Sequence, residues 1–134
     1  NTTSYSSPVQ LGSATDWTSP SCGYQNTAGI RSGKLYSWGR NSSGGVGDGT
    51  VVARNSPVQI GALTTWQEVQ TGNQMAIALK TNGTLWAWGA NYQGQAGQNN
   101  VIKYSSPVQI GSLTDWSRIH MPTSSGATCW ALKA

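Results

Sequence analysis

One four-residue motif recurs along the chain at almost constant spacing. Ser-Pro-Val-Gln begins at Ser7, Ser56 and Ser106, in steps of 49 and 50 residues. Each copy continues as Ser-Pro-Val-Gln-[Leu/Ile]-Gly-x-x-Thr-x-Trp and so ends on a tryptophan in the same phase. A period of this length is typical of arrays in which each repeat buries its apolar face against the next one. The sequence therefore predicts a tandem array built from one repeated unit.

A second motif repeats with the same period and so confirms the phase. The pattern Gly-x-Leu-[Tyr/Trp]-x-Trp-Gly-x-Asn occupies Gly33–Asn41 and again Gly83–Asn91, 50 residues later. Two independent motifs in a fixed relative position are not expected by chance. The third copy of the array stops before this segment.

Within the middle copy, the residue pattern predicts four short strands separated by turns. Asn-Gly at positions 82–83 marks a tight hairpin turn. After it, Leu85 and Ala87 alternate with Trp86 and Trp88, as expected of a strand with two different faces. The expected strands are Trp66–Thr71, Met75–Leu79, Thr84–Trp88 and, opened by Pro107, Val108–Ile110. Four short strands in about 50 residues, with no helical period, predict an all-β fold of antiparallel propeller blades.

The segment Ala78–Gly97 resembles the signature of the regulator-of-chromosome-condensation repeat family. That signature joins Leu-x-x-x-Gly-x-[Val/Leu]-[aromatic]-x-Trp-Gly-x-Asn to Gly-Gln-[small/Leu]-Gly, and both parts are present here. Ile30–Gly47 is similar, with Gly45 in the place of the glutamine. The resemblance implies a seven-bladed β-propeller whose blades have four antiparallel strands each.

The length of the chain predicts an incomplete ring. Seven periods of this size need roughly 350 residues, whereas 134 residues contain fewer than three. We therefore expect a single partial propeller over residues 1–134, with repeats at approximately 1–16, 17–65, 66–115 and 116–134 by blade phase. The chain is then a piece of a longer array, and the alternative is that several copies assemble into a ring.

Few residues suited to catalysis are present. Only 9% of residues are charged, against roughly 25% in an average soluble protein. Four acids, one histidine and two cysteines without CxxC spacing are a poor basis for acid–base catalysis or a zinc site. We expect no catalytic residue, no metal and no cofactor, and therefore no enzyme.

The basic residues do not indicate a nucleic-acid-binding protein, although the net charge is +4. Such a protein needs its basic residues clustered, and the eight lysines and arginines are scattered along the chain. No apolar run is long enough to span a bilayer, so no membrane insertion is expected.

Residues shared by the copies are expected to be structural. We expect blade packing from Trp17, Trp38, Trp66, Trp88 and Trp116. Asp16 and Asp115 share a phase that Thr65 occupies in the middle copy, so they are interpreted as turn or capping residues rather than a catalytic pair. Cys22 and Cys129 belong to the first and third copies, and we expect both to be unbridged and buried.

Residues that depart from the repeat are the candidates for function. The third copy has an insertion within residues 120–128, which indicates a contact loop. Thr50–Asn55 and the segment 24–26 also differ from their counterparts. The candidate contact residues are His120, Met121, Ser124, Ser125, Arg54 and Tyr24.

These features favour a noncatalytic structural or binding module. We expect display on a cell exterior or a virus particle, with other proteins, further copies of the repeat, or glycans as partners. The family resemblance implies a second hypothesis, a guanine-nucleotide exchange factor or chromatin-binding propeller of a small GTPase system. No acidic or loop motif for nucleotide exchange is matched here. The third hypothesis is a self-assembling partial propeller.

Overall fold

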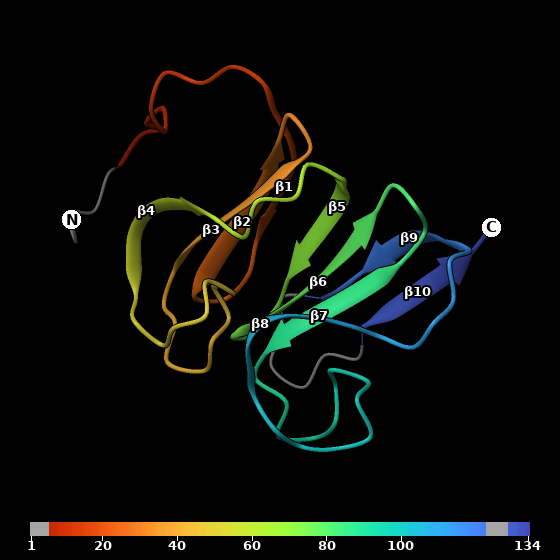
Figure 1. Ribbon diagram of the computed structural model, residues 1–134. Coiled ribbons are helices and arrows are strands. Elements are labelled where there is room, and N and C mark those ends of the chain that lie inside the picture. The colour runs from red at the N-terminus through yellow and green to blue at the C-terminus, as the bar shows by residue number, and fades with distance from the viewer. Residues whose placement is uncertain (1–5, 123–128) are drawn as a thin grey trace.

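Ten short strands form the fold of this protein, whose computed structural model describes residues 6–122 and 129–134 (Figure 1). The first blade is a sheet in the order β1-β2-β3-β4, the second blade is β5-β6-β7-β8, and β9 pairs with β10. The strands are β1 (Trp17–Cys22), β2 (Asn26–Arg31), β3 (Lys34–Gly39), β4 (Arg54–Gln59), β5 (Trp66–Thr71), β6 (Met75–Lys80), β7 (Leu85–Gly89), β8 (Tyr104–Gln109), β9 (Trp116–His120) and β10 (Trp130–Lys133). This confirms the predicted all-β fold, an incomplete propeller with four-stranded antiparallel blades. In the described ranges, no helix is long and apolar enough to cross a membrane.

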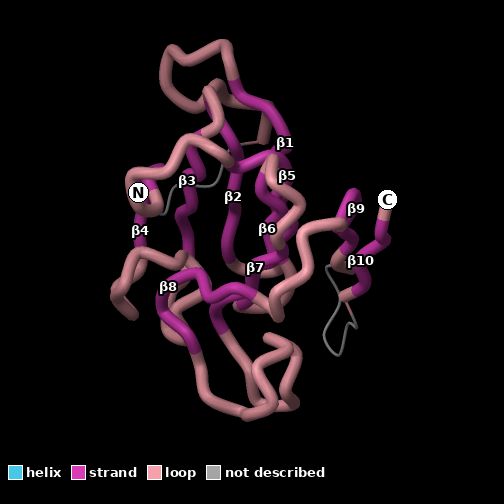
Figure 2. The backbone as a smooth tube through the Cα atoms, turned by 45° about the vertical axis from the view of Figure 1, so that its right-hand side comes forward, coloured by secondary structure: helices cyan, strands magenta, loops and turns pink. Residues whose placement is uncertain are grey.

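The sheets stand side by side, and each leads directly into the next (Figure 2). The hairpin between β6 and β7 holds the start of the third sheet, because Trp116 donates its backbone N–H to the carbonyl of Gly83 at 3.2 Å. Gly83 has a φ of +74°, and an added Cβ would lie 2.0 Å from the carbonyl oxygen of Thr114. Only glycine fits there. Gly33 has the same role before β5, which explains why this glycine and the following tryptophan repeat in one phase.

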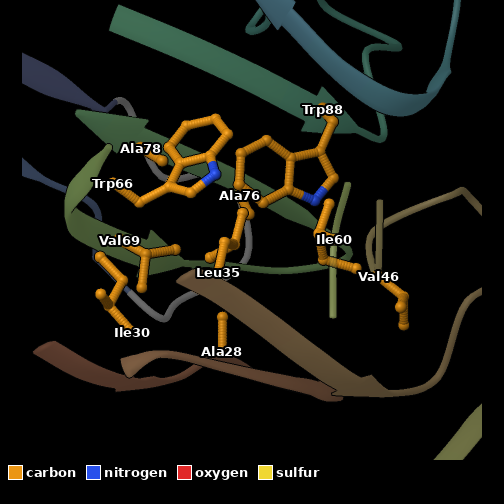
Figure 3. Packing of buried hydrophobic residues seen from close by; sticks show 10 residues of the cluster. All are labelled: Ala28, Ile30, Leu35, Val46, Ile60, Trp66, Val69, Ala76, Ala78 and Trp88. Atoms are coloured by element: carbon orange, nitrogen blue, oxygen red, sulfur yellow. The ribbon is translucent and has the colours of Figure 1, made fainter. Parts of the chain in front are cut away.

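Two apolar layers lie on either side of the second blade. The layer shared with the first blade contains Ala28, Ile30, Leu35, Val46, Ile60, Trp66, Val69, Ala76, Ala78 and Trp88 (Figure 3). The layer facing β9 contains Met75, Ile77, Leu79, Leu85, Ala87, Ala96, Ile119 and Met121. The alternation predicted along β7 is confirmed, since Leu85 and Ala87 lie in one layer and Trp88 in the other.

Side chains in the first strand of one sheet bind the backbone of the first strand of the next sheet. Ser19 and Ser21 of β1 accept hydrogen bonds from the backbone N–H groups of Val69 and Thr71 in β5, at 3.1 and 2.9 Å. Across the next junction, the carboxylate of Glu68 accepts a hydrogen bond from the N–H of Ile119 in β9 at 3.4 Å. Successive blades are therefore linked by polar contacts as well as by apolar packing.

The last strand of the second blade differs from its prediction. The sequence predicts it at Val108–Ile110 after Pro107, but β8 begins at Tyr104, contains the proline and ends at Gln109. The register between β7 and β8 shifts between Ala87 and Gly89, whose partners are Val108 and Tyr104. Pro107 thus lies in an irregular part of an edge strand, where a missing backbone donor is tolerated.

Candidate functional site

Two pockets occupy equivalent positions in the first and second blades. The pocket of the second blade, about 350 Å³, is lined by Gly47, Asp48, Gln59, Ile60, Gly61, Leu63, Trp66, Lys80, Trp86, Ser106 and Pro107. The pocket of the first blade, about 460 Å³, is lined by Leu11, Gly12, Ser13, Ala14, Trp17, Arg31, Tyr36, Ser56 and Pro57. Each has a Ser-Pro pair, two aromatic rings and one cation in the same repeat phase. The repeat therefore builds one kind of cavity in each of these blades.

Lys80 is the cation of the second pocket and lies against two indole rings. Its Nζ is 3.6 Å from the ring centroid of Trp86 and 4.8 Å from that of Trp66. The residue is only 7% exposed, and burial lowers the pKa of its ammonium group. The negative faces of the rings offset part of the cost of this burial.

The corresponding cations of the other two copies have a carboxylate partner. Arg31 donates from Nε to the carboxylate of Asp16 at 2.6 Å. Lys133 Nζ lies 3.3 Å from the carboxylate of Asp115. Both aspartates precede the repeated tryptophan, a position that Thr65 occupies in the middle copy. Within the described residues, Lys80 has no carboxylate within 4 Å.

Asp48 forms another part of the wall of the Lys80 pocket. Its carboxylate pairs with Arg54 and accepts hydrogen bonds from the hydroxyl and backbone N–H of Thr50, at 2.7 and 3.0 Å. Burial on its own would raise the pKa of Asp48, but the hydrogen bonds from Thr50 and Arg54 leave that pKa below its usual value. Asp48 is therefore held as a charged group by its own neighbours.

Buried asparagines stabilise the loops that follow β3 and β7. Asn91 donates from Nδ2 to the carbonyls of Asn100 and Ile102, at 2.9 and 3.0 Å, and accepts from the N–H of Ala96 at 2.7 Å. Asn41 makes the same contacts in the loop after β3. Each loop presents two exposed aliphatic residues in equivalent positions. These pairs, hereafter the aliphatic loop pairs, are Val51 with Val52 and Val101 with Ile102.

The structure does not gather the predicted contact residues into one site. Tyr24 is 71% exposed at the turn between β1 and β2. Arg54 opens β4 and is paired with Asp48. His120 is exposed at the end of β9, with its ring 5.1 Å from that of Trp130. Met121 is buried in the layer facing β9. Ser124 and Ser125 lie outside the described residues.

Of the five tryptophans predicted to pack the blades, Trp66 and Trp88 lie in the layer between the first and second blades, and Trp116 packs against the layer facing β9. Blade packing by Trp17 and Trp38 stays a prediction. Trp66 and Trp88 are buried, whereas Trp17, Trp38 and Trp116 are partly exposed. Trp66 makes edge-on contacts with Trp86 and Trp88, with ring centroids 5.9 and 6.4 Å apart. The indole N–H groups of Trp17, Trp66 and Trp116 are buried and find no partner in the described part of the chain. Because all three copies share this, it is a property of the repeat rather than of one site.

The cysteines are both free. The sequence predicts a buried Cys22, and this prediction is wrong. It ends the edge strand β1 on the face opposite the buried Ser21 and is exposed. Cys129 is half-buried, and burial raises the pKa of its thiol. Over residues 6–122 and 129–134, no three His, Cys, Asp or Glu side chains gather where they could hold a metal.

Comparisons with known proteins match both the repeats and the fold. The model described as "Regulator of chromosome condensation (RCC1) repeat" matches residues 32–79 and 82–126, and a second model of the same description matches residues 66–95. No curated protein matches the chain at a significant level.

Three solved structures share this arrangement of strands. Human WBSCR16 matches with a TM-score of 0.74 and 19% identity, over 87% of this chain and 30% of its own. Prp20p from Saccharomyces cerevisiae matches with a TM-score of 0.65 and 20% identity, over 72% and 26%. Yeast RCC1 (Prp20) bound to Kap60 matches with a TM-score of 0.72 and 18% identity, over 94% and 32%. The chain thus spans about a third or less of each of these proteins.

Proposed function

Because this chain belongs to the regulator of chromosome condensation (RCC1) repeat family, we propose that it is a noncatalytic module that binds another protein. The observation that carries this proposal is the kind of partner named for its structural neighbours. One yeast neighbour is described with its binding properties to Gsp1p and histones, and another is bound to Kap60. All of these partners are proteins, so we prefer a protein to a glycan as the partner.

The aliphatic loop pairs are the surface that we assign to this contact. All four of their side chains are at least 60% exposed. Buried Asn41 and Asn91 fix the loops that carry them, so little ordering cost is incurred on binding. Exposed apolar side chains on a rigid scaffold are typical of protein-binding surfaces. Display on a cell exterior or a virus particle remains a prediction.

Photo-crosslinking tests this proposal. A photoreactive amino acid is placed at Val52 or Ile102, and as a control at exposed Ser112 in the connection before β9. Each variant is irradiated with purified Gsp1p, core histones or Kap60. We expect a crosslink from positions 52 and 102 to at least one of these proteins, and none from position 112. Equal yields at all three positions, or no crosslink, would contradict the proposal.

Nucleotide exchange is the second candidate function. It is favoured because one structural neighbour is described with its binding properties to Gsp1p. The test is the release of fluorescent GDP from Gsp1p with and without this chain. An unchanged rate leaves the binding module as the function, whereas an acceleration of about tenfold or more would replace it with an exchange factor.

Self-assembly into a ring remains the third candidate. Light scattering coupled to size-exclusion chromatography distinguishes it from the other two. A discrete mass of several copies would favour assembly, and the mass of one chain would exclude it.

A further inference from the structure

We propose that the pocket around Lys80 binds a carboxylate group of a partner protein. This deepens the proposed function, since it names the chemistry of one contact and rests on the partner being a protein. The pocket lies between the first and second blades and is lined by residues of both. It is distinct from the aliphatic loop pairs, none of which lines it.

The first argument is the missing counter-ion. Three copies of the repeat place a cation at the end of the same strand, as Arg31, Lys80 and Lys133. In the first and third copies the aspartate directly before the repeated tryptophan pairs with that cation. The middle copy has Thr65 instead and leaves the Lys80 ammonium group without a carboxylate among the described residues. The cation at this strand end thus pairs with a carboxylate in two of the three copies. Only in the middle copy is the position of that carboxylate open to a ligand.

The second argument is that Lys80 is buried and lines an open cavity. An ammonium group that is largely withdrawn from water loses hydration and gains from any anion that reaches it. The faces of Trp66 and Trp86 fix its position without supplying a hydrogen-bond acceptor. The adjoining cavity of about 350 Å³ is within the range of small-ligand pockets. An acidic side chain or a chain end is small enough to enter.

The rest of the lining favours a singly charged anion. Lys80 is the only cation in the described lining of this pocket, and Ser106 adds a single hydroxyl group. Phosphate groups carry up to two charges and usually need several donors or an arginine. Asp48 does not repel an incoming carboxylate strongly, because Arg54 neutralises it and its oxygens already accept hydrogen bonds.

Short capped peptides test the pocket directly. The probes are acetyl-Gly-Glu-Gly-amide, its glutamine counterpart, and acetyl-Gly-Gly-Gly with a free carboxyl end. Binding is followed by tryptophan fluorescence and by amide chemical shifts. We expect the glutamate peptide to bind about tenfold more tightly than the glutamine peptide, because only the glutamate can form a charge-assisted hydrogen bond with the ammonium group of Lys80. The third peptide shows whether a chain end serves as well as an acidic side chain.

Two variants and one control variant test whether Lys80 is the group that binds the glutamate peptide. Thr65→Asp restores the internal partner found in the other copies and should weaken glutamate binding about tenfold or more. Lys80→Met should abolish the preference for glutamate over glutamine, and Lys103→Met, an exposed lysine, should leave it intact. Thermal unfolding of Thr65→Asp should be no less cooperative than that of the unchanged chain, because the other blades carry the same aspartate.

Two results would overturn the proposal that this pocket binds a carboxylate. One is equal affinity for the glutamate and glutamine peptides. The other is unchanged glutamate binding by a folded Thr65→Asp variant. Neither depends on the crosslinks from positions 52 and 102, so failure of the pocket is distinguishable from failure of the proposed function.

Discussion

Individual buried polar residues determine the shape of the loops in this protein. Asn41 and Asn91 are almost completely buried, and each bridges backbone groups up to 11 residues away. Such groups cost free energy when they are buried without partners. The asparagine of the repeated motif therefore has a structural role in both blades.

Replacing Asn91 by alanine should destabilise the fold. The change leaves the buried N–H of Ala96 and two carbonyls without their partner. Each unsatisfied buried group costs about 1–3 kcal/mol, so the free energy of unfolding should fall by at least about 2 kcal/mol in urea denaturation. Asn73→Ala, at an exposed turn position, is the matched control and should cost less than about 0.5 kcal/mol. Equal effects at both positions would contradict the role of Asn91.

The sequence predicts the environment of a residue well where that environment depends on a single strand. Leu85 and Ala87 were assigned to the face opposite Trp86 and Trp88 from alternation alone, and the apolar layers bear this out. The surroundings of Lys80 were not predicted, because Trp66, Trp86 and Lys80 come from three strands and meet only after folding. One sequence feature could have pointed to this pocket: Thr65 occupies the repeat position that is an aspartate, Asp16 or Asp115, in the other two copies.

At the scale of elements, the first strand of each sheet connects it to the next one. β1 supplies serine hydroxyls to the backbone of β5, and β5 supplies a carboxylate to the backbone of β9. Edge strands need partners for their backbone groups. Here the side chains of a neighbouring blade meet part of that need.

Ser21→Ala should therefore loosen the junction between the first two blades. The buried N–H of Thr71 would lose its acceptor, and the Thr71 hydroxyl would lose a partner at 3.2 Å. We expect a loss of about 1–3 kcal/mol in the free energy of unfolding, and faster hydrogen exchange at Thr71. Exposed Ser13→Ala is the control and should change neither quantity. Unchanged exchange at Thr71 would show that the hydroxyl is dispensable.

Element types were more predictable than their ends. The hairpin of β6 and β7 followed from the Asn-Gly turn and from alternation, both of which are local. The start of β8 did not, because Tyr104 pairs with Gly89 through a shifted register that depends on how the intervening loop folds. Proline was interpreted as a strand opener, whereas the irregular pairing allows Pro107 to lie inside the strand.

For the whole molecule, the dependence of stability on pH rests on two aspartates whose pKa is held below its usual value. The hydrogen bonds from Thr50 and Arg54 hold the pKa of Asp48 low against the opposing effect of burial. The hydroxyl of Ser32 and the guanidinium of Arg31 lower the pKa of Asp16. A carboxyl group whose pKa is lower in the folded state stabilises the fold above its unfolded pKa, and this contribution is lost as pH falls through the folded pKa.

Acid should therefore destabilise the protein through Asp48. The melting temperature should vary little between about pH 7 and pH 5 and fall below about pH 4, where aspartate titrates in the unfolded chain. Asp48→Asn should melt lower at neutral pH and show a smaller further fall in acid, in thermal scans followed by circular dichroism. Lys103→Met serves as the control and should keep the acid-induced fall of the unchanged chain. If Asp48→Asn shows the same acid-induced fall in melting temperature as the unchanged chain, other groups cause that fall.

The contacts between the first strands of successive sheets have a direction, and this bears on how such genes change in length. β1 and β5 offer side-chain acceptors to the next blade, and β5 and β9 supply the backbone donors that bind them. Duplication or loss of one 50-residue unit recreates the same junction on both sides. A duplication or loss of any other length separates these acceptor side chains from the backbone N–H groups that they bind, so changes in whole repeats are the steps that this architecture tolerates.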